Sequence, residues 1–329
     1  MTALTGFVAA LILLAAAPAA MAAEATWRPV VQTDHAEDIA GPLGNGKLLV
    51  QSAGGLSLYR PGGSGLQPFA RGAGGYSTPV GSESYMALSS KRRLKYADCS
   101  FGKQNLYAIE PSNGTVVRVT RKGRASVLAA LPAGFLDGIA FDGAGRFGHR
   151  LLVADLVGAE INIYGIDCRG RMRRFGQGLP HVEGGMVVAP AGFGRFGGQL
   201  IAADELSGNI YAFSAKGGTT LIANSGLPAG GDVGTESLGF FPEAAATYPA
   251  AFVASAQGAG SGDGANSVLS IGPKGLRRAG LRPGDLLAAS ETAGTTVRVR
   301  CAGKCSVRRV AGGPAAAHVE GHIAFALPR

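Results

Sequence analysis

The chain has 329 residues, a net charge of +9, 46% hydrophobic and 16% charged residues, 53 glycines and 4 cysteines. This high apolar and low charged content excludes a disordered chain, and the lack of a strict every-third-residue glycine pattern excludes collagen. Four cysteines over this length are too few for a small fold built on disulfides.

The first 23 residues are predicted to be a signal peptide. Phe7–Ala20 is apolar throughout, and Ala20-Met21-Ala22 fits the small-x-small pattern of a cleavage site. An uncleaved membrane anchor is the alternative, because no lysine or arginine precedes the apolar run, but that run is short for a span. We therefore expect a single domain over residues 24–329 that is secreted or periplasmic, and not transmembrane once the signal is cleaved.

Export to an oxidising compartment favours disulfides. Cys301 and Cys305 are expected to clip a tight hairpin, since a metal site there would have no further histidine or cysteine ligand nearby. Cys99 and Cys168 lie far apart in the sequence, and they either pair with each other or both remain free.

Short apolar strands recur along the chain. Gly143–Asp155 and Gly192–Asp204 are identical at eight of thirteen positions, at an offset of 49 residues. Alternating segments such as Asn209–Phe213 follow them, which is typical of β-strands, and glycine-rich turns separate the strands. Weaker copies of the apolar strand are Lys47–Ser52, Leu94–Asp98, Ala251–Ser255 and Asp285–Ser290.

A second motif, in which an acidic residue begins an apolar strand, precedes most of these units. A repeat of about 45–55 residues with about four strands is typical of a propeller blade. We predict an all-β fold, a β-propeller of six four-stranded blades, with five or seven as alternatives. The C-terminal strand is expected to close the ring with a blade that begins near the N-terminus, because closure removes exposed sheet edges. The acidic copies are Glu37–Ile39, Glu83–Leu88, Asp137–Phe141, Glu183–Val188, Glu236–Phe240 and Glu320–Phe325.

Two of these units resemble the blade motif of NHL-repeat and gluconolactonase-like (senescence-marker) propellers. The resemblance lies in Leu136–Asp142 with Leu152–Asp155, and in Gly198–Asp204 with Gly208–Tyr211. It implies a six-bladed propeller and, in the hydrolases, a metal held by a Glu, Asn residues and an Asp at inner strand starts. The other blade starts carry no Asn, so the resemblance does not supply that full ligand set.

Individual positions can still be compared with that family. Glu183 or Glu320 could match its Glu ligand, and Asp137 stands where the family often has Asn.

Three histidines stand two residues before an acidic residue: His35, His181 and His318. Residues i and i+2 of a strand point to one face, and the first strand of each blade lines the central channel. Imidazole and carboxylate side chains from several blades would then converge and suit a divalent cation. The predicted metal ligands are His181, Glu183, His318 and Glu320, with Glu37 and Glu236 as further ligand-binding residues.

The alternative for the acidic residues is structural, because a repeated carboxylate can accept backbone hydrogen bonds from the next blade. We expect that role more for Glu83 and Glu236, which have no histidine two residues earlier. Crowded carboxylates repel one another unless a cation or a proton intervenes, which supports a bound ion.

Two functions follow from this pattern. The first is an exported binding or scaffold propeller that holds a small molecule, a cation, or an envelope or protein partner. The second is a metal-dependent lactone or ester hydrolase of gluconolactonase-like type, in which His322 or Asp137 would serve as base. The cofactor expected is a divalent cation, Ca, Mg, Mn or Zn, with no nucleotide and no haem.

The two Gly-x-Gly-x-x-Gly segments, which start at Gly143 and Gly192, precede strands instead of opening a helix, so they predict turns and no dinucleotide site. Basic clusters such as Arg169–Arg174 and Arg308-Arg309 are expected on outer strands, where charge blunts sheet edges. They show no interleaving with aromatic residues, so no nucleic-acid partner is expected.

Overall fold

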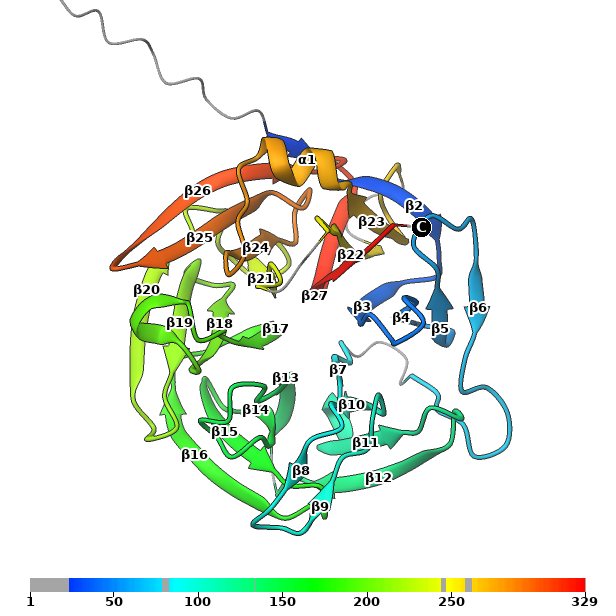
Figure 1. Ribbon diagram of the computed structural model, residues 1–329, viewed down its shortest axis with the longest axis vertical. Helices are drawn as coiled ribbons and strands as arrows, with labels where there is room; N and C mark the ends of the chain where they lie inside the picture. The colour runs from blue at the N-terminus through cyan, green and yellow to red at the C-terminus, as the bar shows by residue number, and fades with distance from the viewer. Residues whose placement is uncertain (1–23, 79–82, 133, 244–246, 258–261, 329) are drawn as a thin grey trace, which may run out of the picture.

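The computed structural model describes residues 24–78, 83–132, 134–243, 247–257 and 262–328. The predicted signal peptide, residues 1–23, lies outside the described residues. Short β-strands form most of the described chain, arranged as curled sheets around a central axis (Figure 1). The predicted all-β propeller fold is confirmed.

The first half of the chain forms sheets in sequence order, from the axis outwards. One sheet has the order β3 (Ala36–Ala40), β4 (Leu48–Ser52), β5 (Gly55–Tyr59) and β6 (Leu66–Pro68). The next has the order β7 (Met86–Leu88), β10 (Leu106–Glu110), β11 (Thr115–Val119) and β12 (Ala125–Ala130), with the hairpin of β8 (Arg93–Leu94) and β9 (Cys99–Ser100) inserted after β7.

Two further groups of strands join into one sheet through a single parallel pairing, Gly138 with Gly184. The first contains β13 (Phe135–Phe141), β14 (Leu151–Val157), β15 (Glu160–Ile166) and β16 (Met172–Leu179). The second contains β17 (Glu183–Val188), β18 (Leu200–Asp204), β19 (Asn209–Phe213) and β20 (Thr219–Asn224). The short helices of the described chain are η1 (Pro111–Asn113), η2 (Gly194–Phe196) and α1 (Pro273–Arg278).

The last part of the chain is interleaved between two neighbouring groups of strands. The first group has the order β21 (Thr235–Phe240), β24 (Leu286–Ser290), β25 (Thr296–Ala302), β26 (Lys304–Gly312) and β1 (Ala25–Thr26). The second has the order β27 (Ala317–Ala326), β22 (Ala250–Gln257), β23 (Ser267–Ile271) and β2 (Arg28–Gln32). After β21 the chain therefore visits β22 and β23, and returns through α1 to β24.

This interleaving explains an irregularity in the repeats. The unit around Asp285–Val310 has no acidic strand next to it in the sequence, and the structure supplies one from β21, which pairs with β24. The strand that begins near Glu320 instead pairs with β22. Because β27 and the N-terminal β2 share one sheet, the predicted closure of the ring by the C-terminal strand is confirmed.

The hydrophobic core is divided into clusters that lie between neighbouring sheets. Tyr59 from β5 meets Phe252 from β22 edge to face, with ring centroids 6.0 Å apart, in the cluster where the end of the chain meets its beginning. Equivalent clusters lie between the other neighbouring groups of strands. Burial of apolar side chains between sheets, more than pairing between them, therefore holds the ring together.

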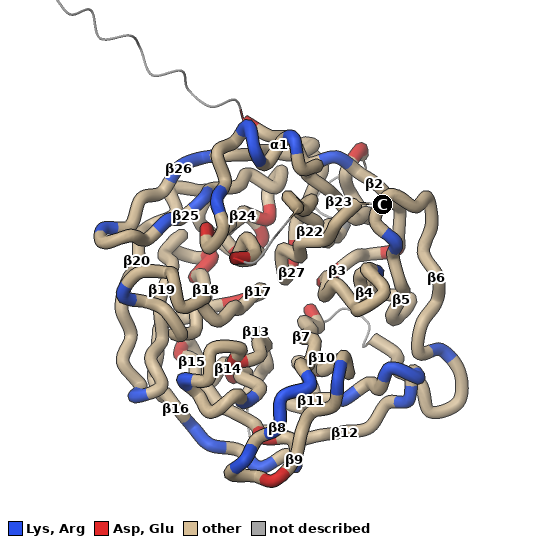
Figure 2. The backbone as a smooth tube through the Cα atoms, viewed as in Figure 1, with Lys and Arg blue, Asp and Glu red and all other residues tan. Residues whose placement is uncertain are grey.

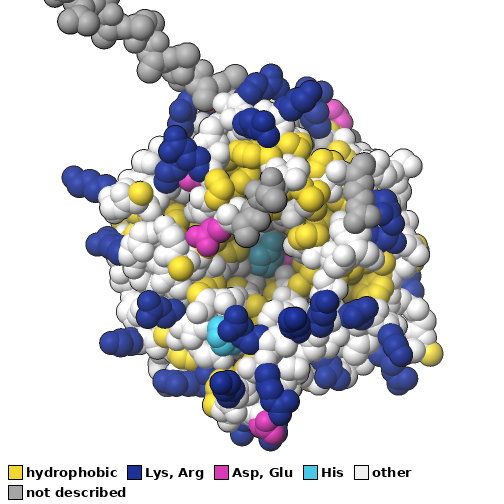
Figure 3. All heavy atoms as spheres, viewed as in Figure 1, with side chains coloured by type: hydrophobic (Ala, Val, Ile, Leu, Met, Phe, Trp, Pro, Cys, Tyr) yellow, Lys and Arg dark blue, Asp and Glu magenta, His cyan; other side chains and the backbone are white. Residues whose placement is uncertain are grey.

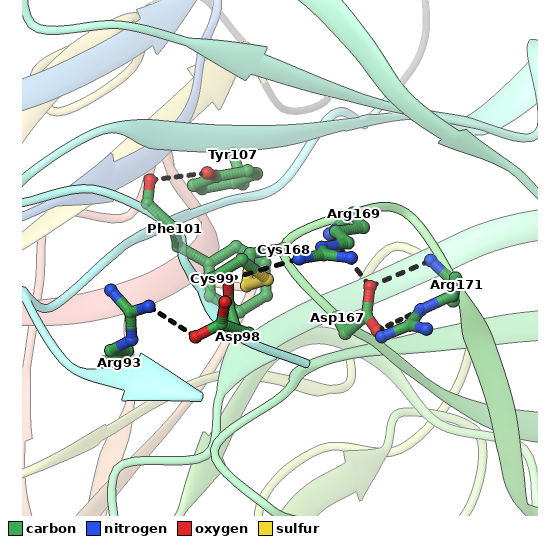
Figure 4. Close-up of a disulfide and its surroundings, with 9 residues drawn as sticks. All are labelled: Arg93, Asp98, Cys99, Phe101, Tyr107, Asp167, Cys168, Arg169 and Arg171. Atoms are coloured by element: carbon green, nitrogen blue, oxygen red, sulfur yellow. Dashed lines mark hydrogen bonds and ion pairs between the residues drawn. A yellow bond between two sulfur atoms is a disulfide. The ribbon is translucent and has the colours of Figure 1, made fainter. Parts of the chain in front are cut away.

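All four cysteines form disulfides. Cys301 and Cys305 face each other in the β25–β26 hairpin, as predicted. Cys99 pairs with Cys168, which settles the alternatives left open by the sequence and ties the β8–β9 hairpin to the turn after β15 (Figure 4). Arg169 reinforces this link by donating to the carbonyl of Asp98 at 3.3 Å.

The basic residues lie mostly away from the axis, whereas many acidic residues lie on or near inner strands (Figure 2). Arg173 and Arg174 lie on β16, the outermost strand of its group, and Arg308 and Arg309 lie on β26. No helix in the described part of the chain is long and apolar enough to cross a membrane.

Candidate metal centre

Each innermost strand carries an acidic residue at or near its start, as the repeated motif predicts. Strand pairing shows how several of these side chains are turned towards the axis. Glu37, Asp137 and Glu236 are each the residue skipped in the register with the neighbouring strand, at a β-bulge. A β-bulge interrupts the alternation of side chains and changes the direction of the extra residue's side chain. These acidic side chains therefore do not follow the alternation of the other residues in the strand.

Glycines beside these acids allow the inner strands to approach one another closely. Gly184 has φ +76°, and a Cβ atom there would lie 2.2 Å from Cγ of Glu236. Gly321 has φ +63°, and its Cβ would lie 2.4 Å from Oδ1 of Asp38. Both positions need glycine because of the backbone conformation and because of the neighbouring carboxyl group.

Six glutamates, with one histidine and one tyrosine, gather at one end of the axis; we call this set the glutamate cluster. Tyr85 Oη donates to Glu236 Oε1 at 2.6 Å and lies 3.1 Å from Glu83 Oε2. Nε2 of His318 lies 2.8 Å from Glu320 Oε1 and 3.1 Å from Glu291 Oε1. The cluster comprises Glu83, Glu183, Glu205, Glu236, Glu291, Glu320, His318 and Tyr85.

The remaining glutamates complete the cluster by facing other carboxyl groups. The Glu183 carboxyl lies within hydrogen-bonding reach of that of Glu83, and the Glu205 carboxyl lies within reach of those of Glu183 and Glu291. Two ionised carboxylates have no proton to share and repel each other, so such a contact requires that one is protonated or that a cation lies between them. Within the described residues, no lysine or arginine forms an ion pair with any of the six glutamates.

Burial and mutual repulsion raise the pKa values of four glutamates of the cluster. Burial, followed by the charge of Glu236, raises the pKa of Glu183 to about 11. Burial, followed by repulsion from neighbouring glutamates, raises the pKa values of Glu236 and Glu320 well above the usual range. Burial and the charge of Glu291 raise the pKa of Glu205 to about 7. The protein alone therefore does not stabilise the fully ionised cluster.

Two triads in the cluster have donor atoms close enough to share an ion. Glu83, Glu236 and Glu320 form one triad, and Glu291, His318 and Glu320 form the other. In each triad the donor atoms lie within 4.8 Å of one another. Calcium–oxygen bonds are about 2.3–2.6 Å long, so ligands on opposite sides of the ion lie about twice that distance apart. The donor atoms are thus spaced as cation ligands would be.

A fully buried oxygen of the cluster lacks a hydrogen-bond partner in the described structure. Glu320 is 2% exposed, yet its Oε2 atom accepts no hydrogen bond. Asp137, whose pKa is affected by the charges of Glu83 and Glu205, is also 2% exposed and has an unpartnered Oδ2. Burial raises the pKa of Asp137 to about 8. Buried oxygens without donors are costly, and a cation or water would satisfy them.

His322 has a different environment, on the axis between several inner strands. Its Nδ1–H donates to Asp38 at 3.0 Å, and Nε2–H donates to the carbonyls of Met186 at 2.9 Å and Ile139 at 3.1 Å. Both ring nitrogens therefore face acceptors only, which requires the doubly protonated imidazolium. Burial opposes this charge, but Asp38 and the two carbonyls outweigh it and raise the pKa of His322.

The other end of the axis holds a pocket of about 300 Å³. Its lining comes from residues further along the inner strands than the acidic ones, and it includes Met86, Phe141, Met186, Phe240 and His322. Figure 3 shows this face of the molecule hollowed near its centre, where hydrophobic side chains gather, with lysine and arginine side chains around it. The axis thus has a carboxylate-rich end and a mainly apolar end.

The structure brings together some of the predicted site residues and separates others. Glu183, Glu236, His318 and Glu320 all lie in the glutamate cluster. His181 does not, since its Nδ1 lies 3.8 Å from Asp204 Oδ1 and has no hydrogen-bond partner in the described chain.

Glu37 lies beside the cluster and not within it. Gln51 Nε2 donates to its carboxyl at 3.3 Å, and burial raises the pKa of Glu37 to about 8. The charges of Glu83 and Asp38 raise that pKa further, which places Glu37 in the same electrostatic environment.

Sequence reasoning missed Glu205, Glu291 and Tyr85, and it gave Glu83 a structural role. A signal for two of them is present in the repeats. Glu205 follows Leu200–Asp204, and Glu291 follows Leu286–Ser290, so both occupy the position directly after the second strand of a blade. The repetition of an acidic residue directly after the second strand of a blade is therefore the signal that would have added Glu205 and Glu291 to the predicted site.

No family model and no curated protein sequence matches the chain. Solved structures that resemble it include virginiamycin B lyase from Staphylococcus aureus, at 12% identity over 89% of this chain and 92% of that one, with a TM-score of 0.45. A protein of unknown function from Bacteroides thetaiotaomicron matches at 11% identity over 90% and 68%, with a TM-score of 0.47. A gluconolactonase from Xanthomonas campestris matches at 13% identity over 69% and 68%, with a TM-score of 0.39.

Proposed function

We propose that the protein is an exported, six-bladed binding propeller whose glutamate cluster holds a divalent cation. The observation that carries this proposal is the burial of carboxyl groups against one another without a lysine or arginine partner in the described structure. Glu320 is the clearest case, because its buried Oε2 has no donor. A cation would compensate the charge and satisfy this oxygen at the same time.

The donor set favours a hard cation. Carboxylate oxygens with a single imidazole suit Ca²⁺, Mg²⁺ or Mn²⁺, whereas Zn²⁺ centres usually contain more nitrogen or sulfur ligands. Glu83, Glu236, Glu291, Glu320 and His318 would supply the ligands. Glu183 and Glu205 each lie within reach of another carboxyl of the cluster, and their protonation would adjust the net charge around the cation.

The remaining parts of the proposal concern location and partner. Two disulfides suit an oxidising compartment outside the cytoplasm. The apolar pocket at the opposite end of the axis would accept a small molecule or a side chain of an envelope or protein partner. In this proposal the cation stabilises the axis, and the pocket end binds the partner.

A metal-dependent lactone or ester hydrolase is a second candidate, and one observation favours it. Asp137 has a pKa of about 8 and an unpartnered Oδ2, so it holds a proton near neutral pH and could exchange it with a substrate. His322 would not serve as the base in this scheme, because both of its ring nitrogens are occupied.

Elemental analysis of the purified protein after exhaustive dialysis tests the proposal. About one equivalent or more of Ca, Mg or Mn is expected in the native protein, and Glu320→Gln should lose it. Glu160→Gln is the control, because Glu160 is exposed on β15 and carries the same change of charge. A metal-free native protein whose melting temperature does not respond to added cation would contradict the proposal. A lactone and ester screen with Asp137→Asn separates the two candidates.

A further inference from the structure

The two ligand triads overlap at one residue, since Glu320 belongs to both. We propose that the glutamate cluster binds two divalent cations, bridged by the Glu320 carboxylate. This inference rests on the proposed function, in which the cluster holds at least one cation, and goes beyond it by assigning a dinuclear centre.

The geometry of Glu320 suits a bridge. Its Oε1 lies 2.8 Å from His318 Nε2, on the side of the triad that contains Glu291. Its Oε2 has no hydrogen-bond partner, and its carboxyl lies within hydrogen-bonding reach of the Glu236 carboxyl, which belongs to the other triad. One oxygen of this buried carboxylate thus contacts the imidazole of the second triad, and the other has no hydrogen-bond partner and is free to bind a second ion.

The triads also differ in chemistry, which argues for two sites over one site with alternative ligands. Glu83, Glu236 and Glu320 offer only oxygen, and Tyr85 fixes the first two by contacting both carboxyls. Glu291, His318 and Glu320 include an imidazole nitrogen, and the Gly234 N–H holds Glu291 in place at 3.0 Å. The first triad suits Ca²⁺ or Mg²⁺, and the second tolerates a transition metal such as Mn²⁺.

The charge of the cluster supports the same conclusion. Its six glutamates are compensated by only one basic side chain of the cluster, His318. One divalent ion would still leave an excess of buried carboxylates with few donors. A second ion at the His318 triad would replace the imidazole proton that now lies between His318, Glu291 and Glu320. If both ions share Glu320, each of them is also close to the other carboxylates of the glutamate cluster.

A Mn²⁺ titration of the metal-free protein tests this inference. Isothermal titration calorimetry gives the stoichiometry, and low-temperature electron paramagnetic resonance detects spin coupling between neighbouring ions. We expect two equivalents and a coupled signal for the native protein. Glu83→Gln and Glu291→Gln should each bind one equivalent and lose the coupling, and Glu320→Gln should lose both ions. Glu160→Gln, at an exposed position of β15, should behave as the native protein does.

The outcomes separate the inference from the proposed function. One equivalent in the native protein would overturn the dinuclear centre and leave the proposed function standing. No binding would overturn both. Two uncoupled ions, or two ions retained by both Glu83→Gln and Glu291→Gln, would place the second ion elsewhere and overturn the bridge. Far-ultraviolet circular dichroism of each variant shows whether a lost site reflects a lost fold; the two single variants test the bridge even if Glu320→Gln does not fold.

Discussion

Gly184 shows how a single missing side chain shapes the glutamate cluster. Its positive φ and its closeness to Glu236 mean that any β-carbon would both strain the backbone and displace a proposed ligand. The cluster therefore depends on glycines as much as on acids.

Gly184→Ala should lower the free energy of unfolding by about 2 kcal/mol or more, from backbone strain and overlap with Glu236. It should also weaken cation binding. Gly158→Ala is a matched control, because Gly158 has φ +68° but a Cβ atom there would meet nothing within 4 Å. Urea unfolding of both variants gives the comparison, and equal losses would show that Glu236 is not crowded.

Glu37→Gln tests the electrostatics of the buried acids. Burial raises the pKa of Glu37 from 4.5 to about 8, so the folded state holds a proton that the unfolded state releases between those values. The metal-free protein should therefore lose stability as pH rises through this window, by at most about 1.4 kcal/mol per pH unit for this group. The variant, neutral at every pH, should show a smaller slope. Thermal unfolding from pH 4.5 to 8.5 measures it, and an unchanged slope would contradict the assignment.

The site residues were predictable only where residue type and repetition coincided. His318 and Glu320 were found because they repeat as His-x-Glu, but the same pattern at His181 places the histidine beside Asp204. The reason is that His318 lies within β27, whereas His181 precedes β17, which begins at Glu183, so the alternation of side chains along a strand does not apply to His181.

Strand β27 contacts the inner strands of three other groups of strands through His322. The imidazolium reaches Asp38 in β3 and carbonyls of Ile139 and Met186 in β13 and β17. One side chain thus holds strands from separate sheets around the axis.

His322→Gln should destabilise the protein by about 2 kcal/mol near pH 6, because it removes charge-assisted hydrogen bonds. The folded pKa of His322 is raised, so its charged form stabilises the fold fully below the unfolded pKa of about 6.5. That contribution is lost as pH rises through the folded pKa, and the difference between the native protein and the variant should shrink. Denaturant unfolding at pH 6 and pH 9 measures this; a difference that grows with pH would contradict the imidazolium.

The two disulfides offer a comparison between elements. Cys99–Cys168 closes 69 residues and joins the β8–β9 hairpin to the neighbouring sheet, whereas Cys301–Cys305 closes only 4 residues within one hairpin. In the chain-entropy view the longer loop stabilises by about 4 kcal/mol and the shorter by about 2 kcal/mol.

The double variant Cys99→Ser/Cys168→Ser should therefore lower the unfolding free energy more than Cys301→Ser/Cys305→Ser does. Guanidinium unfolding under non-reducing conditions measures both. A larger loss for the short hairpin would mean that local strand pairing, and not closure of the long loop, decides the effect.

For the whole molecule, the sequence predicted the fold class and the ring closure but not the path of the chain through the last two groups of strands. The repeats at Ala251–Ser255 and Asp285–Ser290 look alike as strands, so each could follow the acidic strand near Glu236. In the structure that acidic strand, β21, pairs with β24, which is the repeat at Asp285–Ser290. Local pattern cannot decide between two such partners, because the choice depends on which long-range pairing completes the core.

The interleaving of the last two groups of strands also determines the order in which strands can pair during translation. Strand β2 leaves the ribosome early, yet its partner β23 comes much later, and their sheet receives its innermost strand only with β27. Until then β22 has an unpaired edge and the first sheet has no neighbour on one side. The ring can therefore close only when translation has passed residue 326, so the sheets that are complete earlier must wait for the last strand before the ring is finished.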